Sequence, residues 1–156
     1  MELVESVANE AVAHEVECDV LDARVGVLAA QLHALSAELI DTIAEFDALG
    51  GSKGFSSTAQ WLSVRAGFTP GEARRLCALA RRRDELPTLM GHARAGQLSP
   101  GVLATAARVV TADNEERVAE IAASCTPAQT ARVLSTYRGV TPPPDPDLAP
   151  EPERDA

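Results

Sequence analysis

Apolar side chains recur every three or four residues through the first third of the chain, the spacing that places them on one face of an α-helix. The positions that share this face are Leu21, Val25, Leu28, Leu32, Leu35, Leu39, Ile43, Phe46 and Leu49. They predict a long amphipathic helix over residues 20–49, ended by Gly50 and Gly51. A preceding helix is predicted over residues 2–16, and two arrangements stay open: the two helices fuse into one, or Asp19 caps the second.

The first six of these positions, from Leu21 to Leu39, follow a strict alternation of four-residue and three-residue steps. That alternation is typical of a coiled-coil seam, in which the apolar stripe pairs with the same stripe of a second copy. It is equally satisfied by one stripe packed inside the chain's own helical bundle. We take the bundle as the default and keep pairing between copies as the alternative.

Helix-start signals follow one another through the rest of the chain. Capping-box pairs, in which a side chain and the backbone satisfy each other three residues apart, are Ser57/Gln60, Thr69/Glu72, Asp113/Glu116 and Thr126/Gln129. Prolines suited to a first helical position are Pro70, Pro87, Pro100 and Pro127. The predicted helices are 57–66, 70–84, 87–95, 100–111, 114–124 and 127–138. With no alternating run to suggest a strand, we expect an all-α bundle of about six to eight helices.

Composition sets the limits of this bundle. The chain has 156 residues, 46% of them apolar but only 3% aromatic, which suits closely packed Ala- and Leu-rich helices. Six of the ten prolines lie in the last eighteen residues, GVTPPPDPDLAPEPERDA. We therefore expect one helical domain over residues 1–138 and a disordered, acidic, proline-rich linker or tail over residues 139–156.

The N-terminus and the cysteines indicate the compartment. Cys18, Cys77 and Cys125 are too few and too scattered for a disulfide framework, which favours a reducing environment. The acidic N-terminus lacks the basic start of a secretory signal. No run approaches the ~20 apolar residues of a membrane span. We expect a soluble, cytoplasmic protein with no membrane partner.

Charge is unevenly placed along the chain. The formal net charge is −9, yet residues 51–111 carry nine basic and three acidic side chains. The flanking segments, residues 1–50 and 112–156, are both strongly acidic. A local basic field matters more than the net charge for binding a polyanion.

The basic side chains concentrate in a helix-turn-helix-like segment, residues 57–84. Leu62 and Ala66 are expected to face the partner helix, Gly67 to permit the turn, and Phe68 to fill the gap. On the second helix Ala73, Leu76, Cys77 and Ala80 form the core stripe, and Arg83 lies near the helix end. Facing away are Arg74, Arg75, Arg81 and Arg82, which we predict to contact duplex DNA. The alternative is that these arginines only solvate the surface.

The sequence offers little for catalysis or metal binding. His14 and Cys18 are four residues apart, so one helix face presents both, but the chain has no second pair at ligand spacing. His33 and His92 are more simply packing or surface residues, and Trp61 a core anchor. No phosphate loop, nucleophile elbow or Cys-x-x-Cys occurs. We expect no catalytic residues, no cofactor and no metal.

Several of these segments together resemble a known family. The window from Ser57 through Arg83, containing STAQWLSVRAGFTPGEARRLCALARR, is similar to domain of unknown function 222, the actinobacterial 13E12 repeat family. The later segments ELPTLMGHARAGQLSPGVLATAARVV and CTPAQTARVLSTYRGV fit as well. The resemblance covers roughly residues 20–145 and includes the long N-terminal helix.

Many members of that family continue into an HNH endonuclease module. This sequence has neither a closely spaced His/Asn/His set nor zinc-knuckle cysteines, so the nuclease chemistry is not carried over to it. The family has no settled molecular role for this part. With the basic face of the 70–84 helix, the resemblance favours a non-catalytic helical module that helps to position an HNH endonuclease-type protein, or a relic of one, on DNA. The alternative is a helical interaction or dimerisation module with no nucleic-acid role.

Overall fold

The computed structural model describes residues 1–138, which form seven α-helices and one 3-10 helix and contain no strand. The elements are α1 (Glu2–Ala48), α2 (Thr58–Ala66), α3 (Pro70–Arg82), η1 (Arg83–Glu85), α4 (Pro87–Arg94), α5 (Pro100–Ala107), α6 (Glu115–Ser124) and α7 (Pro127–Arg138). The all-α prediction is confirmed. The proline-rich tail predicted over residues 139–156 lies outside the described residues.

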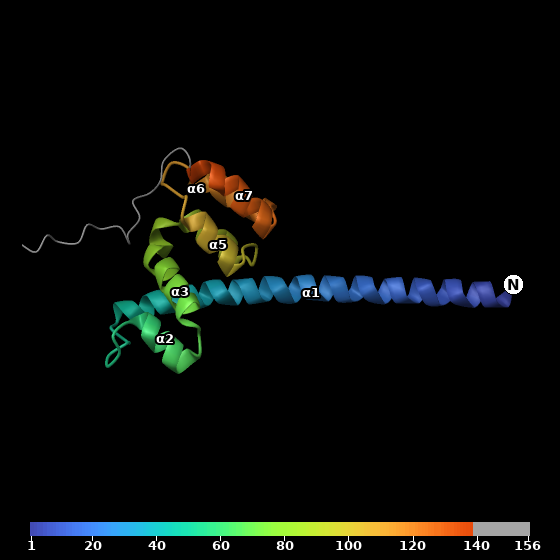
Figure 1. Cartoon of the computed structure of the whole chain (residues 1–156), viewed down its shortest axis with the longest axis horizontal. Coiled ribbons are helices and arrows are strands. Elements are labelled where there is room, and N and C mark those ends of the chain that lie inside the picture. The colour runs from blue at the N-terminus through green and yellow to red at the C-terminus, as the bar shows by residue number, and fades with distance from the viewer. Residues whose placement is uncertain (139–156) are drawn as a thin grey trace, which may run out of the picture.

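Helix α1 is a single rod, and the other helices gather around its C-terminal part (Figure 1). The predicted long N-terminal helix is confirmed, and the helices expected over 2–16 and 20–49 are fused, because α1 runs unbroken through Asp19. The linking residues Glu17, Cys18 and Asp19 include no glycine or proline that would end a helix. Every residue from 1 to 28 is exposed, and we call residues 2–28 the arm.

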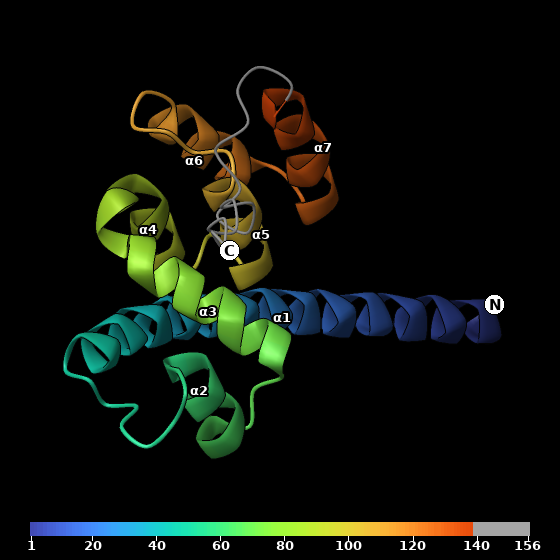
Figure 2. The same ribbon diagram turned by 60° about the vertical axis from the view of Figure 1, so that its left-hand side comes forward.

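The core lies where α1 meets the following helices. Ala37, Ile40 and Ile43 are the fully buried positions of α1, and α3 and α4 pack directly against this part of the rod. Figure 2 shows α2 on one side of α3 and the α4–α7 group on the other. Leu89 and Met90 of α4 are completely buried at the centre of the domain. One compact core thus encloses the last third of α1 and leaves the rest of the rod outside.

Most of the predicted helix starts are confirmed. Thr69 and Glu72 form a complete capping box at the start of α3, and Thr126 and Gln129 exchange the same two bonds at α7. At α2 only half of the predicted box forms: the Ser57 hydroxyl accepts from the Gln60 backbone N–H, but the Gln60 side chain accepts from the backbone N–H of Ser56 instead of Ser57. The predicted helices 70–84 and 100–111 extend too far toward the C-terminus, since α3 ends at Arg82 and α5 at Ala107.

The box predicted for Asp113 and Glu116 was wrong. The N-cap of α6 is Asn114, whose side-chain oxygen accepts from the backbone N–H of Thr111. The next residue, Glu115, instead accepts from the backbone N–H groups of Thr88 and Leu89, at 2.7 and 3.0 Å. A carboxylate of α6 therefore caps α4, a long-range bond that spacing alone does not reveal.

The corner between α2 and α3 largely follows the prediction. Gly67 adopts a left-handed conformation with φ of 75°, Leu62 is buried, and Phe68 packs half-buried against the core. Ala66 was misplaced, because its side chain is exposed at the end of α2. Trp61 packs against Phe46 of α1, with ring centroids 4.5 Å apart and the ring planes tilted by 45°, which ties α2 to the rod.

The rod is also fixed to the domain by one close backbone approach. Gly96 follows α4 with φ of 77°, and a Cβ placed there would lie 2.4 Å from the backbone oxygen of Ala30. Glycine is therefore required both for the left-handed conformation and for the contact. This contact lies just beyond the arm, where α1 enters the domain.

Candidate interaction surfaces

The apolar stripe of α1 divides into an uncovered part and a covered part. Its uncovered members are 51% to 65% exposed and are Leu21, Val25, Leu28, Leu32 and Leu35, which we call the seam. Leu39 is half-buried and Ile43 is buried in the core. The default interpretation, a stripe packed in its own bundle, was thus wrong for the seam and holds only from Leu39 onward.

The arm has little reason to be helical on its own. It contains seven valines, whose branched side chains lose conformational freedom in a helix. Helices in proteins gain most of their stability by packing an apolar face against other elements. Within residues 1–138 nothing packs on the arm. An exposed apolar helix face of this length is characteristic of an interaction surface.

The second candidate surface is the outer face of α3. Arg74, Arg75 and Arg81 are exposed there, while the predicted core stripe behind them is buried. Arg82 differs from these three, since its side chain is 37% exposed and its Nε lies 3.1 Å from Glu85. Its guanidinium also donates to the backbone carbonyl of Ala107, which links α3 to α5. Three of the four predicted DNA-contacting arginines are therefore exposed, and one of them, Arg81, also borders the groove between α1 and α3.

Two further arginines of the basic region hold the fold together. Arg94 donates two bonds to the Asp41 carboxylate, at 2.7 and 2.8 Å, and Arg83 donates to the Asp41 backbone carbonyl at 2.8 Å. Arg83 also lies 3.7 Å from Glu45. The bonds from Arg94, with the charges of both arginines, hold the pKa of Asp41 below its usual value. Sequence reasoning missed this cluster because its members lie 42 and 53 residues apart.

One acid stands beside the basic face. Glu72 is exposed at the start of α3, and Thr69 donates to its carboxylate through the hydroxyl at 2.7 Å and the backbone N–H at 2.9 Å. These bonds, helped by the charge of Arg75, lower the pKa of Glu72. The helix N-terminus thus already holds an anion, so a nucleic-acid phosphate is expected to meet the arginines further along α3.

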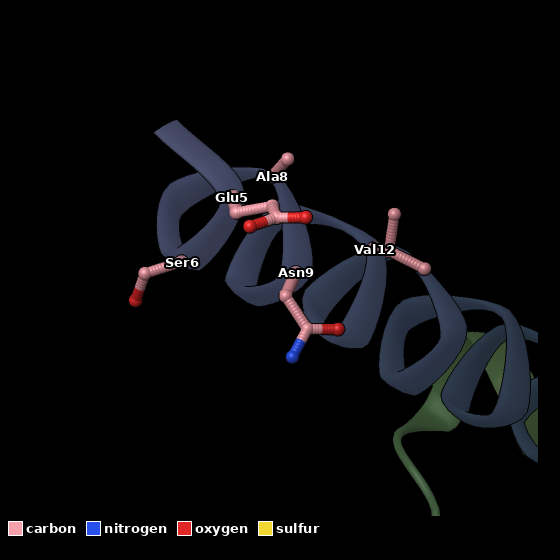
Figure 3. A pocket seen from close by; sticks show the side chains of 5 residues that line it. All are labelled: Glu5, Ser6, Ala8, Asn9 and Val12. Carbon is pink, nitrogen blue, oxygen red and sulfur yellow. The ribbon is translucent and has the colours of Figure 1, made fainter. Parts of the chain in front are cut away.

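Two hollows on the surface of residues 1–138 are open to solvent and not enclosed. The one drawn in Figure 3 is bounded by Glu5, Ser6, Ala8, Asn9 and Val12, all of the arm itself, and is open helix surface. A shallow groove between α1 and α3 has Asp47, Cys77, Arg81 and Asp84 among its lining residues. Burial raises the pKa of the Cys77 thiol, which disfavours the reactive thiolate.

His14 and Cys18 lie together on the arm. The Cys18 Sγ is 3.8 Å from the His14 Nε2, one turn of helix apart, and both side chains are exposed. Among residues 1–138 no group of three or more His, Cys, Asp and Glu side chains is placed to hold a metal ion. A single chain therefore offers two ligands at this position.

One observation opposes the expectation that the protein has no membrane partner. Helix α1 is long enough to cross a bilayer and contains an 18-residue window apolar enough to do so, of which 17% is buried. The same property occurs in core helices of soluble proteins and in signal sequences. The absence of a membrane partner stays a prediction.

The sequence and the fold were compared with known proteins. No protein-family profile, no curated protein and no solved structure matches this chain.

Proposed function

We propose that the chain is a non-catalytic helical interaction module that associates with a second copy of itself through the seam of α1. The uncovered seam carries this proposal: five large apolar side chains repeat at four-residue and three-residue steps and remain more than half exposed. Two such seams facing each other bury these side chains in the knobs-into-holes packing of a coiled coil. The alternation matches the geometry of a partner helix better than that of a flat surface or a lipid bilayer.

The mass of the protein in solution tests this proposal. The single chain has a mass of 16.4 kDa. Static light scattering over a range of concentrations is expected to show twice this mass, falling toward the single-chain value on dilution. A mass that stays at the single-chain value at the highest concentrations contradicts the proposal. Binding to vesicles of neutral lipid without self-association would favour a membrane role for α1 instead.

The second candidate function is weak binding of duplex DNA through the outer face of α3. The observation that favours it is the free exposure of Arg74, Arg75 and Arg81 on one side of that helix. This candidate also accords with the resemblance to the 13E12 repeat family, in which such a module would help to target an HNH endonuclease-type protein. Two copies joined at α1 would present two such faces, which raises the apparent affinity without new contacts.

Salt dependence measures how many phosphates these arginines contact. Three contacts per chain give a slope of log K against log salt of about −2.7, and six contacts per dimer about −5. The triple variant Arg74→Gln/Arg75→Gln/Arg81→Gln is expected to abolish retention on duplex DNA. Arg82→Gln should reduce it less, since this side chain already bonds to Ala107 and Glu85.

Matched controls for this experiment are Arg117→Gln and Arg132→Gln, which remove exposed arginines of α6 and α7. Neither control is expected to change retention, because these side chains lie away from the outer face of α3. If the wild-type protein shows no retention even at low salt, the DNA candidate is wrong and the interaction module stands alone.

A further inference from the structure

The heptad pattern of the seam continues toward the N-terminus of α1, where its next two positions are Cys18 and His14. In the frame where Val25 and Leu32 occupy a positions and Leu21, Leu28 and Leu35 occupy d positions, Cys18 falls at a and His14 at d. Both ligands thus lie on the same helix face as the seam. A second copy bound along this face supplies the second His–Cys pair that the single chain lacks.

We propose that two copies of the chain, paired in parallel and in register along α1, hold one zinc ion between His14 and Cys18 of each copy. This inference rests on the proposed self-association. Two histidines and two cysteines make the tetrahedral set that structural zinc prefers. The site is incomplete in one copy, which explains why no metal cluster exists within residues 1–138 of a single chain.

The separation of the two ligands already suits a shared tetrahedral metal. With Zn–S of about 2.3 Å, Zn–N of about 2.05 Å and a tetrahedral angle, the two donor atoms of one chain should lie roughly 3.6 Å apart. The observed distance between Cys18 Sγ and His14 Nε2 is 3.8 Å. The i, i+4 spacing on a straight helix therefore places the pair near chelating geometry before any metal binds.

Parallel pairing is the orientation that buries the whole seam and joins the two ligand pairs. An antiparallel pairing centred on Val16 also brings the four ligands together, but it leaves Leu32 and Leu35 beyond the end of the partner helix. An antiparallel pairing centred on Val25 covers the seam but separates the two His–Cys pairs. Only the parallel, in-register arrangement meets both conditions.

Charge on the arm favours a cation at this level. The positions flanking the seam around the ligands are all acidic: Glu10 and Glu17 at g, and Glu15 and Asp22 at e. In a parallel pair Glu10 faces Glu15 of the other copy, and Glu17 faces Asp22, so like charges oppose each other. A divalent cation between the helices offsets this repulsion. The metal is thus expected to hold the acidic N-terminal parts of the two arms together. The seam, from Leu21 to Leu35, associates without it.

The test uses the full chain under reducing conditions, with Co²⁺ as the spectroscopic probe and Zn²⁺ as the competitor. The expected result is the visible absorption of tetrahedral, thiolate-bound Co²⁺, saturating at one ion per two chains and lost on addition of Zn²⁺. His14→Ala and Cys18→Ala should each abolish this spectrum. The matched controls His33→Ala and Cys125→Ala remove the same residue types outside the predicted site and should leave it unchanged.

Association measured in a chelator separates this inference from the proposed function. A protein that is dimeric in chelator but yields no thiolate–Co²⁺ spectrum overturns the metal site and leaves the seam intact. A protein that stays monomeric with and without metal overturns both. The double variant Leu28→Ala/Leu32→Ala should bind Co²⁺ at least tenfold more weakly, and an unchanged spectrum in it would overturn the shared site.

Discussion

Truncating the seam should dissociate the dimer without unfolding the domain. Leu28 and Leu32 are 51% and 64% exposed in the single chain, so this share of each side chain is available for burial by a partner. Full burial of a leucine contributes about 1.5–3 kcal/mol, and the available share therefore about 1–2 kcal/mol. Because the double variant Leu28→Ala/Leu32→Ala removes four such side chains from a dimer, it should lose about 4–8 kcal/mol of association free energy. At about 1.4 kcal/mol per decade, the dissociation constant rises by about three to six orders of magnitude.

Sedimentation equilibrium at several concentrations measures that constant directly. Thermal unfolding of the domain followed by Trp61 fluorescence should barely change, because the two leucines do not contact the core of their own chain. Far-ultraviolet circular dichroism should fall with dissociation, because the arm loses the packing that supports its helix.

A matched pair of valines on the same helix provides the control. Val25 lies on the seam and is 65% exposed, while Val27 lies two residues along, off the seam, and is 57% exposed. Val25→Ala removes two methyl groups from each copy, at about 0.8 kcal/mol per fully buried group, and should weaken the dimer by about 2 kcal/mol. Val27→Ala should change it little. Equal effects of the two substitutions, or a wild-type protein that never dimerises, would refute the reasoning.

Three further predictions concern the domain itself. Gly96→Ala should destabilise it by about 1–3 kcal/mol through strain and its clash with α1, whereas Gly91→Ala, in open space on α4, should stabilise it by about 0.5–1 kcal/mol in chemical denaturation. Thr130→Val should raise the melting temperature, because the fully buried hydroxyl of Thr130 has no hydrogen-bond partner within residues 1–138. The folded pKa of Asp41 lies below its unfolded value of about 3.8. The contribution of its carboxylate to the free energy of unfolding is therefore complete above about pH 3.8 and is lost as the pH falls through the folded pKa. Asp41→Asn should flatten this part of the dependence of stability on pH.

Local chemistry made most of the helices predictable. Capping pairs such as Thr69/Glu72 and prolines such as Pro70 act through bonds within three residues, so their spacing in the sequence is sufficient. The buried stripe of α3 followed from helical periodicity for the same reason. Whether the helices over 2–16 and 20–49 fuse could not be decided, because a cap-forming residue such as Asp19 also fits inside a helix when no glycine or proline accompanies it.

The long-range partners of the charged residues were not predictable. Arg74 and Arg82 read alike in sequence, yet Arg82 reaches the carbonyl of Ala107, 25 residues away, and Arg74 is exposed with no such bond to any of residues 1–138. The apolar periodicity of α1 likewise identifies a face but not what covers it. Leu35 is exposed although Gly96 contacts α1 further along, at Ala30, so its exposure depends on which face of the rod the remaining helices pack against.

The arm gives this small protein an extended hydrodynamic profile. A helix rises 1.5 Å per residue, so the arm projects about 40 Å from the domain. A particle of this shape experiences more friction than a sphere of the same mass, and on a sizing column a single chain elutes early, where a compact dimer would elute. Elution volume alone therefore overstates the number of chains, whereas scattered light and sedimentation equilibrium report mass independently of shape.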